Sequence, residues 1–251
     1  MKKISIINLK GGVGKTMSSI NIAHILATVY KKRVLIIDND KQGNTTKFFN
    51  KHEEEDYSIS DLLTNRCSID EVIVKTGFEN LDLIPANMSL AKANLEIIKD
   101  ETSPQPFRLK NHLEDIEGEY DYCVIDNPPD INISAINALV ASDDVLIPIK
   151  IDKFAFDGMK ELIEQIENAK VINPKLELKG CFVTLFNKND VNIQGEELLK
   201  NNKEYKMFNT HIRRTVKADE STFANAPILE YSKRCGAAKD YKALVEEYLS
   251  K

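Results

Sequence analysis

The 251-residue sequence predicts an α/β fold, a single-domain, doubly wound, mostly parallel sheet with helices on both faces. Two observations predict it. Short apolar runs alternate along the chain with longer segments whose apolar residues recur at helical spacing. A glycine-rich segment also joins the first apolar run to the first helical pattern, which is typical of a strand, a turn and a helix in succession. Such alternation indicates parallel strands joined by crossover helices.

The apolar runs are the candidate strands. They cover residues 4–9, 34–37, 81–84, 122–125, 145–149, 181–186 and, more weakly, 207–212. Residues 16–30 and 156–169 carry their apolar side chains on one helical face and are expected to pack on the sheet. Ser68 to Glu71 has the spacing of a helix-capping box, and Asn173-Pro174 is expected to end a helix. The charged run at 52–56 is expected to be a solvated loop.

Composition limits the class of protein. An apolar content of 42% is enough for the core of one domain spanning residues 1–251. The formal net charge of −5 argues against coating of nucleic acid by the whole surface, so any DNA contact needs a local basic patch. The sequence starts without a signal segment, and no apolar run approaches the roughly 20 residues that span a bilayer, so we expect a cytoplasmic protein. The four cysteines, Cys67, Cys123, Cys181 and Cys235, lack zinc-ligand spacing and are expected to be reduced. Three of the four are expected in or near the core.

The segment LKGGVGKT at 9–16 has the character of a phosphate-binding loop. Such a turn directs backbone N–H groups and a helix N-terminus at a polyphosphate, Lys15 reaches the β- and γ-oxygens, and Thr16 offers its hydroxyl to Mg²⁺. Leu9 stands where the strict pattern has glycine, and Lys10 is an additional lysine. The candidate nucleotide contacts are Lys10, Gly11, Gly12, Val13, Gly14, Lys15, Thr16 and Met17.

Carboxylates follow two of the candidate strands at the edge of the sheet where ligands bind in such folds. Asp126 is an acid of Walker B type, which holds Mg²⁺ through a coordinated water. Asp38 is expected near the metal, which gives Thr16, Asp38 and Asp126 as the metal set, and Asp40 is expected to position the attacking water. The roles of Asp38 and Asp40 are exchangeable. With Lys10 and Lys15 as the catalytic cations, the set predicts slow hydrolysis of ATP.

These segments resemble the ParA/Soj partition ATPases, in the deviant Walker A group that also contains MinD, ArsA and the nitrogenase iron protein. The resemblance runs nearly end to end and includes residues 10–16, 38–44, 126–129, 148–158, 212–216, Glu220, 226–228 and 238–241. It implies a P-loop NTPase fold of the SIMIBI type. It further implies an ATP-bound homodimer that binds DNA without sequence preference, associates with the nucleoid and is stimulated by a ParB-like partner bound to a centromere.

The resemblance also implies a role for the additional lysine. Lys10 would reach across the dimer to the nucleotide held by the other subunit. A cation supplied in trans by an arginine finger is worth about 10³ to 10⁵ in rate, or roughly 4 to 7 kcal/mol. The alternative is that Lys10 only contacts its own loop.

The sequence departs from the family pattern at four positions. Lys41 stands in place of proline, Met17 in place of threonine or serine, Asp130 in place of serine, and Lys150 in place of glutamine. These changes leave the hydrolysis rate open without affecting the expected fold.

A basic segment is the candidate DNA contact. Residues 203–217 carry five cations against the single anion Glu204, and the pair at 233–234 extends the patch. Only nine residues precede Lys10, so no helix-turn-helix domain and no operator-specific binding are expected. The alternative interpretation is a solvated charged surface. The candidate residues are Arg213, Arg214, Lys217, Lys233 and Arg234.

Other members of the group are the alternatives. A membrane-cycling ATPase resembling MinD needs a basic amphipathic tail, whereas the apolar residues of 239–249 are expected to belong to the core. An iron protein needs a cysteine shortly after Asp126, and an anion-pump ATPase needs a second phosphate loop; the sequence contains neither. A nucleotide-gated scaffold with negligible turnover remains open. The cargo and the partner protein are not determined by the sequence.

Overall fold

The computed structural model of the chain describes residues 1–51, 56–153 and 155–251. Within them, seven strands form one sheet in the order β3-β4-β2-β5-β1-β6-β7, and every neighbouring pair is parallel except β3 and β4. The predicted α/β class and mostly parallel sheet are confirmed. Most of the charged run at 52–56 lies outside the described residues. The strands are β1 (Lys2–Ile6), β2 (Val34–Asp38), β3 (Val74–Lys75), β4 (Leu81–Ile84), β5 (Tyr122–Asp126), β6 (Asp144–Lys150) and β7 (Glu177–Thr184).

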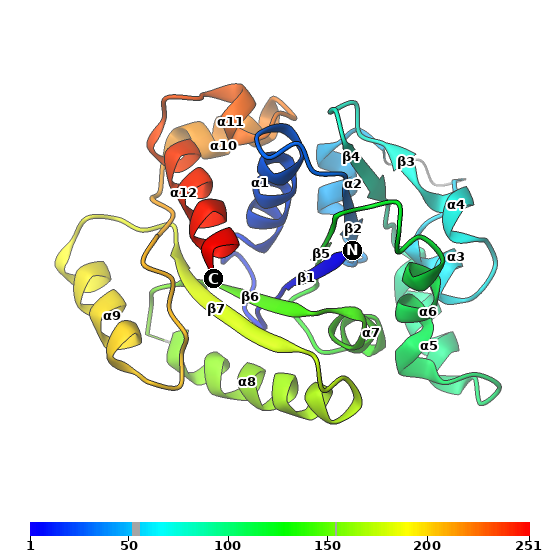
Figure 1. Cartoon of the computed structure of the whole chain (residues 1–251). Coiled ribbons are helices and arrows are strands. Elements are labelled where there is room, and N and C mark those ends of the chain that lie inside the picture. Colours follow the sequence, from blue (N-terminus) through cyan, green and yellow to red (C-terminus); the bar gives the residue numbers. More distant parts are fainter. Residues whose placement is uncertain (52–55, 154) are drawn as a thin grey trace.

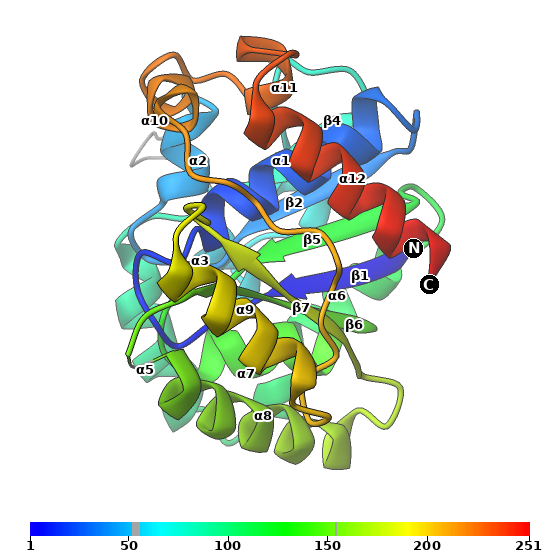
Figure 2. The same ribbon diagram turned by 90° about the vertical axis from the view of Figure 1, so that its left-hand side faces the viewer.

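Helices cover both faces of the sheet (Figures 1 and 2). One face carries α1 (Lys15–Thr28), α2 (Asn44–Phe48), α10 (Val216–Phe223), α11 (Ile228–Tyr231) and α12 (Gly236–Ser250). The other carries α3 (Ile59–Leu63), α4 (Ile69–Val72), α5 (Ser89–Lys99), the 3₁₀ turn Gln105–Phe107, α6 (Arg108–Asp115), α7 (Ile133–Ala141), α8 (Ala155–Ile172) and α9 (Asp190–Asn201).

The continuous apolar runs follow from this coverage. In β2, Val34 and Ile36 pack under α1, while Leu35 and Ile37 pack against the opposite layer, and all four are fully buried. A strand buried on both faces needs apolar side chains at every position, so its sequence does not alternate. Because the central strands are parallel, their carboxyl ends, and the polar residues that follow them, lie at one edge of the sheet.

The weakest of the expected strands is wrong. Residues 207–212 run beside β7, and the amides of Phe208 and Ile212 donate to carbonyls of β7 at 2.8 Å, but the pairing amounts to isolated bridges at Met207 and Arg213 and forms no continuous strand. Between these bridges the backbone N–H groups of Asn209 and Thr210 donate to the carboxylate of Glu247 on α12, at 2.8 and 3.0 Å, instead of to a strand. A long-range side-chain contact thus replaces the ladder.

Local signals at helix ends are confirmed. Ser68 and Glu71 form the predicted capping box, although α4 ends after one turn and the chain continues into β3. α8 ends at Ile172, directly before Asn173-Pro174. Cys67, Cys123 and Cys181 are buried, as expected.

Candidate nucleotide site

Two glycines with left-handed backbones shape the phosphate loop. Gly12 and Gly14 have φ angles of 69° and 82°, which an L side chain adopts only under strain. α1 begins immediately after Gly14, and no side chain caps its first turn. The N-terminal amides of this 14-residue helix are therefore free to bind an anion. The hydroxyl of Thr184, at the end of β7, donates to the Val13 carbonyl at 2.7 Å and fixes the loop to the sheet.

The two lysines of the loop occupy different environments. Lys15 is buried, and its Nζ donates to the Lys10 carbonyl at 3.0 Å. Burial lowers the pKa of Lys15, while the nearby carboxylate of Asp126 opposes that change. The half-exposed Lys10 forms an ion pair with Asp152 of the same chain. The described chain thus contains a contact of Lys10 within its own subunit, and the contact across a dimer stays a prediction.

Asp38 and Asp126 are register partners at the ends of neighbouring strands, and both are buried. Burial raises the pKa of each carboxyl above its usual range, and the negative charge of Asp126 raises that of Asp38 further. Asp126 accepts hydrogen bonds from Ser19 Oγ at 3.1 Å and Thr45 Oγ1 at 2.8 Å. The arrangement concentrates negative charge at one point, and among the described residues Lys15 is the cation that acts on it.

α2 supplies hydroxyl groups that orient these acids, and the sequence interpretation missed them. The backbone N–H and the hydroxyl of Thr46 donate to Asp38 Oδ2 at 2.8 and 2.7 Å, and the hydroxyl of the adjacent Thr45 donates to Asp126. The available signal was a pair of threonines just after Gly43, a left-handed turn residue that follows the acidic strand end.

A pair of buried asparagines, which the sequence interpretation also missed, connects the loops after β2 and β5. Asn39 Nδ2 donates to Asn127 Oδ1 and to the Ser134 carbonyl, each at 3.0 Å. Both asparagines are buried. A displacement of one acidic loop would therefore be transmitted to the other.

Asp40 lies nearer to solvent than Asp38. Its backbone N–H donates to Asp38 Oδ1 at 3.2 Å, and its own Oδ1 accepts from the Gln42 amide at 3.0 Å. Asp40 also lines a cavity of about 180 Å³ together with Lys41 and Asp130, two of the positions that depart from the family pattern. A half-buried carboxylate with one local donor keeps the capacity to orient a water molecule.

The oxygen atoms at this edge fit a magnesium ion. Thr16, Asp38 and Asp126 offer one hydroxyl and two carboxylates, the hard donors that Mg²⁺ prefers while it retains several waters. Among the described residues, no group of three His, Cys, Asp or Glu side chains forms an all-protein metal cage. The donor set matches an ion that is shared with phosphate oxygens.

A small cavity of about 90 Å³ opens beside the phosphate loop, between the loop, the end of β7 and α10. Gly14, Met17, Thr184 and Leu185 line one side, and Thr215 and Ala218 line the other. Its position next to the loop makes it a candidate site for the sugar and base of a nucleotide. Gly14 and Met17 are predicted nucleotide contacts, whereas the lining residues from the end of β7 and from α10 were not predicted as such.

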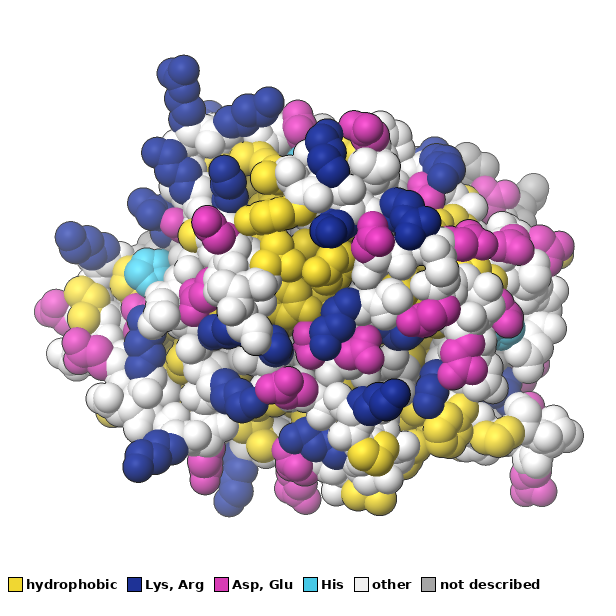
Figure 3. Space-filling view, in the orientation of Figure 1, with side chains coloured by type: hydrophobic (Ala, Val, Ile, Leu, Met, Phe, Trp, Pro, Cys, Tyr) yellow, Lys and Arg dark blue, Asp and Glu magenta, His cyan; other side chains and the backbone are white. Residues whose placement is uncertain are grey.

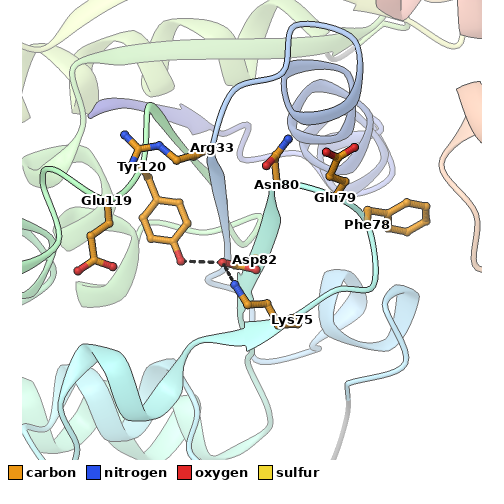
Figure 4. Close-up of a pocket in the computed structure, with 8 residues that line it drawn as sticks. All are labelled: Arg33, Lys75, Phe78, Glu79, Asn80, Asp82, Glu119 and Tyr120. Atoms are coloured by element: carbon orange, nitrogen blue, oxygen red, sulfur yellow. Dashed lines mark hydrogen bonds and ion pairs between the residues drawn. The ribbon is translucent and has the colours of Figure 1, made fainter.

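A larger cavity of about 460 Å³ lies at the opposite edge of the sheet, at the amino ends of β2 and β4 (Figure 4). On its wall, Asp82 accepts hydrogen bonds from Tyr120 Oη at 2.9 Å and Lys75 Nζ at 2.8 Å. None of the predicted nucleotide contacts lines it. Volume alone therefore does not identify the nucleotide site.

The predicted DNA residues converge at the start of α12. Figure 3 shows lysines and arginines gathered at the upper left, over the elements α10 to α12. Arg213 lies against Gly236 but is bound by Asp240 through two contacts of 2.7 Å, and Lys217 pairs with Glu220 at 2.7 Å. The exposed side chains of Arg214, Lys233 and Arg234 make no ion pair with any described residue; Lys239 and Lys242, on the exposed face of α12, likewise have no ion-pair partner there.

Comparison with known proteins agrees with this geometry. A family profile described as an AAA domain matches residues 1–178. The chain is 36% identical over 249 residues to the sporulation initiation inhibitor protein Soj of Bacillus subtilis, covering 98% of this chain and 97% of that protein. It is 32% identical over 254 residues to the chromosome-partitioning ATPase Soj of Treponema pallidum, covering 100% and 98%. A putative plasmid partition protein of Borrelia burgdorferi, solved with AMPPNP, superposes with a TM-score of 0.82 at 28% identity and covers 99% of this chain and 98% of its own. The chain belongs to the ParA/Soj family of partition ATPases.

Proposed function

We propose that this protein is a Mg²⁺-dependent ATPase that segregates DNA, whether a plasmid or a chromosome, by cycling between DNA-bound and released states. The observation that carries the proposal is the placement of buried Lys15, at the N-terminus of α1, beside the paired carboxylates Asp38 and Asp126. This arrangement suits a triphosphate with its metal, because each anion and cation offsets a charge that is otherwise costly to bury.

The chain's own groups bind and orient the nucleotide in this proposal. The amides of 11–16 hold the phosphates, and Lys15 Nζ exchanges the Lys10 carbonyl for phosphate oxygens. The base and ribose occupy the cavity of about 90 Å³ beside Met17. Thr16, Asp38 and Asp126 hold Mg²⁺, which when bound supplies positive charge against the phosphates. Asp40 orients the attacking water.

Dimerisation completes the proposed site. In the single chain Lys10 pairs with Asp152 at the edge of the loop. In an ATP-bound sandwich of two 1–251 domains, Lys10 instead contacts the phosphates held by the other subunit. The proposal thus links a change of partner for Lys10 to the rate of hydrolysis and makes the monomer nearly inert.

Non-specific DNA binding is assigned to the basic surface at the start of α12. Arg214, Lys233 and Arg234 are the primary contacts, because Arg213 and Lys217 are engaged by carboxylates. Lys239 extends the surface along the helix. Dimerisation doubles the number of phosphate contacts, which makes the affinity steeply dependent on salt. A ParB-like partner would stimulate hydrolysis and release the DNA, and the ATP-bound protein would associate with the nucleoid.

The central experiment combines DNA co-sedimentation and light scattering with ATP, ADP and no nucleotide. Wild type is expected to dimerise and bind DNA only with ATP. Lys15→Ala is expected to do neither, Lys10→Ala to lose hydrolysis, and Asp40→Ala to remain as a DNA-bound ATP dimer. DNA binding that ignores the nucleotide would contradict the switch.

The DNA surface has its own test with a matched control. Charge reversal of two of the three primary contacts, Lys233 and Arg234, to Glu is expected to weaken binding of random duplex DNA by at least about tenfold at low salt and to reduce the salt dependence. The control reverses Lys160 and Lys175, exposed lysines of α8 and the following turn. Equal loss in both variants would mean that overall charge, not this surface, governs binding.

Two other functions make different predictions. A membrane-cycling ATPase would bind anionic vesicles, but the apolar residues Tyr241, Leu244 and Val245 of α12 are packed in the core, and the described residues contain no helix long and apolar enough to cross a bilayer. A nucleotide-gated scaffold would dimerise with ATP without measurable turnover, even with DNA and partner present. Vesicle flotation and phosphate release separate these outcomes from the proposal.

A further inference from the structure

The outer face of α5 exposes large apolar side chains on a helix whose inner face is fully packed. Leu90 and Ile97 are buried in the core, whereas Met88, Leu95 and Ile98 are 61%, 62% and 55% exposed. At about 100° per residue, the three exposed side chains fall within an arc of about 80°. Met88 is the N-cap residue of α5, and exposed apolar side chains that share one helix face in this way favour an interaction surface more than isolated ones do.

The two edges of this α5 stripe, which consists of Met88, Leu95 and Ile98, differ in chemistry. Lys92 and Lys99 lie along one edge, both exposed, and neither makes an ion pair with a described residue. The nearest acid on the helix, Glu96, is already bound by Arg66 at 2.7 Å. A partner that follows the stripe therefore meets uncompensated positive charge along one side.

The other edge leads to the nucleotide site. Asn94 and Leu90 line the cavity of about 180 Å³, whose opposite walls are Asp40 and Lys41 after β2 and Pro128 to Asp130 after β5. These are the loops that carry the acids of the site. A side chain inserted into this cavity would touch both loops at once, so its affinity would depend on how nucleotide arranges them.

We propose that the α5 stripe is the docking surface for an amphipathic helix of a partner protein, apolar along its centre and acidic along the edge that faces Lys92 and Lys99. Helix-in-groove recognition of this kind uses apolar anchors at helical spacing, while the charged edge sets orientation. Two copies of this chain pairing antiparallel through the stripe would instead bring lysine edges together, which is unfavourable. The inference goes beyond the proposed function: a helix docked on the stripe would reach the loops that carry Asp40 and Asp130.

The test uses full-length protein with ATP and Mg²⁺ and a fluorescein-labelled 18-residue helical peptide with leucines on one face and glutamates along its edges. A second peptide carries lysines in place of the glutamates. In fluorescence anisotropy, the acidic peptide is expected to bind at least about tenfold more tightly. Lys92→Glu with Lys99→Glu is expected to invert the preference. Equal affinity for both peptides would overturn the proposal.

Matched variants locate the binding. Leu95→Glu with Ile98→Glu is expected to weaken the acidic peptide at least about tenfold. Val191→Glu with Leu198→Glu, at two exposed apolar positions of α9, is expected to leave binding unchanged. Circular dichroism and thermal melting of each variant confirm that it is folded, since all four positions are exposed. Undiminished binding to the α5 variant would place the peptide elsewhere and overturn the proposal.

Two further readouts separate the possible failures. If sedimentation velocity shows a nucleotide-independent dimer that the α5 variant abolishes, the stripe contacts a second copy and the proposal is wrong. Peptide binding and ATP turnover are measured independently. Binding without turnover would refute the proposed ATPase and support the docking surface, whereas turnover without binding would do the reverse.

Discussion

Buried carboxylates at the two edges of the sheet differ in their partners. At the amino edge, Asp82 accepts hydrogen bonds from Tyr120 and Lys75. Asp144 accepts one from Tyr248 at 2.7 Å and forms an ion pair with Lys2 at 2.9 Å. Each acid there has its own cation. At the carboxyl edge, Asp38 accepts only neutral donors and lies beside Asp126, and its pKa is raised by burial.

The difference separates acids that are paired within the chain from those that we propose to bind the metal. A carboxylate that is paired within the chain stabilises the fold and has no need of a ligand. A carboxylate that is buried beside another without a full complement of cations destabilises the ligand-free protein and is relieved by a bound cation. The cavity at the amino edge is larger, but the charge imbalance lies at the carboxyl edge.

The largest expected effect is on the rate of ATP hydrolysis, and it should differ between a lysine at the carboxyl edge and one at the amino edge. Lys15→Ala is expected to reduce ATP hydrolysis by at least about 10²-fold, because it removes the charge aimed at the phosphates. Lys75→Ala, at the amino edge, is expected to change the rate less than about twofold. Phosphate release at saturating Mg²⁺-ATP measures both. Comparable losses would remove the distinction between the edges.

Neutralising one acid at each edge is expected to change stability in opposite directions. At pH 8 without nucleotide, Asp38→Asn is expected to raise the free energy of unfolding by about 1 kcal/mol or more, since it removes repulsion with Asp126. Asp82→Asn is expected to lower it by about 1 to 3 kcal/mol, because Lys75 and Tyr120 lose an ionised acceptor. Urea titration measures both changes.

The pH dependence of the same pair sharpens the comparison. Burial raises the pKa of Asp38 to about 7, so between about pH 4 and pH 7 the folded protein binds more protons at this group than the unfolded chain does. The destabilisation therefore grows as pH rises, and the gain from Asp38→Asn should shrink as pH falls toward 4. A gain that is independent of pH would indicate a packing effect instead.

A buried histidine in the half of α1 near the amino edge should change the free energy of unfolding with pH in the opposite direction. Burial lowers the pKa of His24 to about 4, and its ring packs edge-on against Phe78 at 5.1 Å. Because the unfolded chain binds the proton more readily, wild type is expected to lose about 1 kcal/mol per pH unit between 6.5 and 4. In acid-unfolding experiments, His24→Phe should reduce this loss of stability between pH 6.5 and 4. An unchanged loss would mean that other groups cause it.

The smallest effect is expected at an exposed pair. Lys206 contacts Glu177 at 2.8 Å at the start of β7, and both side chains are about half exposed. Lys206→Ala is expected to change the free energy of unfolding by no more than about 0.5 kcal/mol in urea titration. A change above about 1 kcal/mol would show that solvent-exposed pairs also support this edge.

Local patterns were sufficient for much of the fold. Continuous apolar runs identified the central strands because both faces are buried, and Ser68 with Glu71 formed its capping box because the partners are three residues apart. The weak run at 207–212 failed because Glu247, about forty residues later, captures the amides of Asn209 and Thr210. No local pattern contains that competitor.

The sequence by itself determined the phosphate loop, the central parallel strands and the acids at their ends, since each depends on neighbours in the chain. Only the tertiary structure decided which charged side chains have an ion-pair partner. Arg213 forms an ion pair with Asp240, whereas Asp38 is oriented by Thr46 and has no ion-pair partner among the described residues. Charge pairing acts over a few ångströms in space whatever the separation along the chain, so the partners become known only when the sheet brings its ends together.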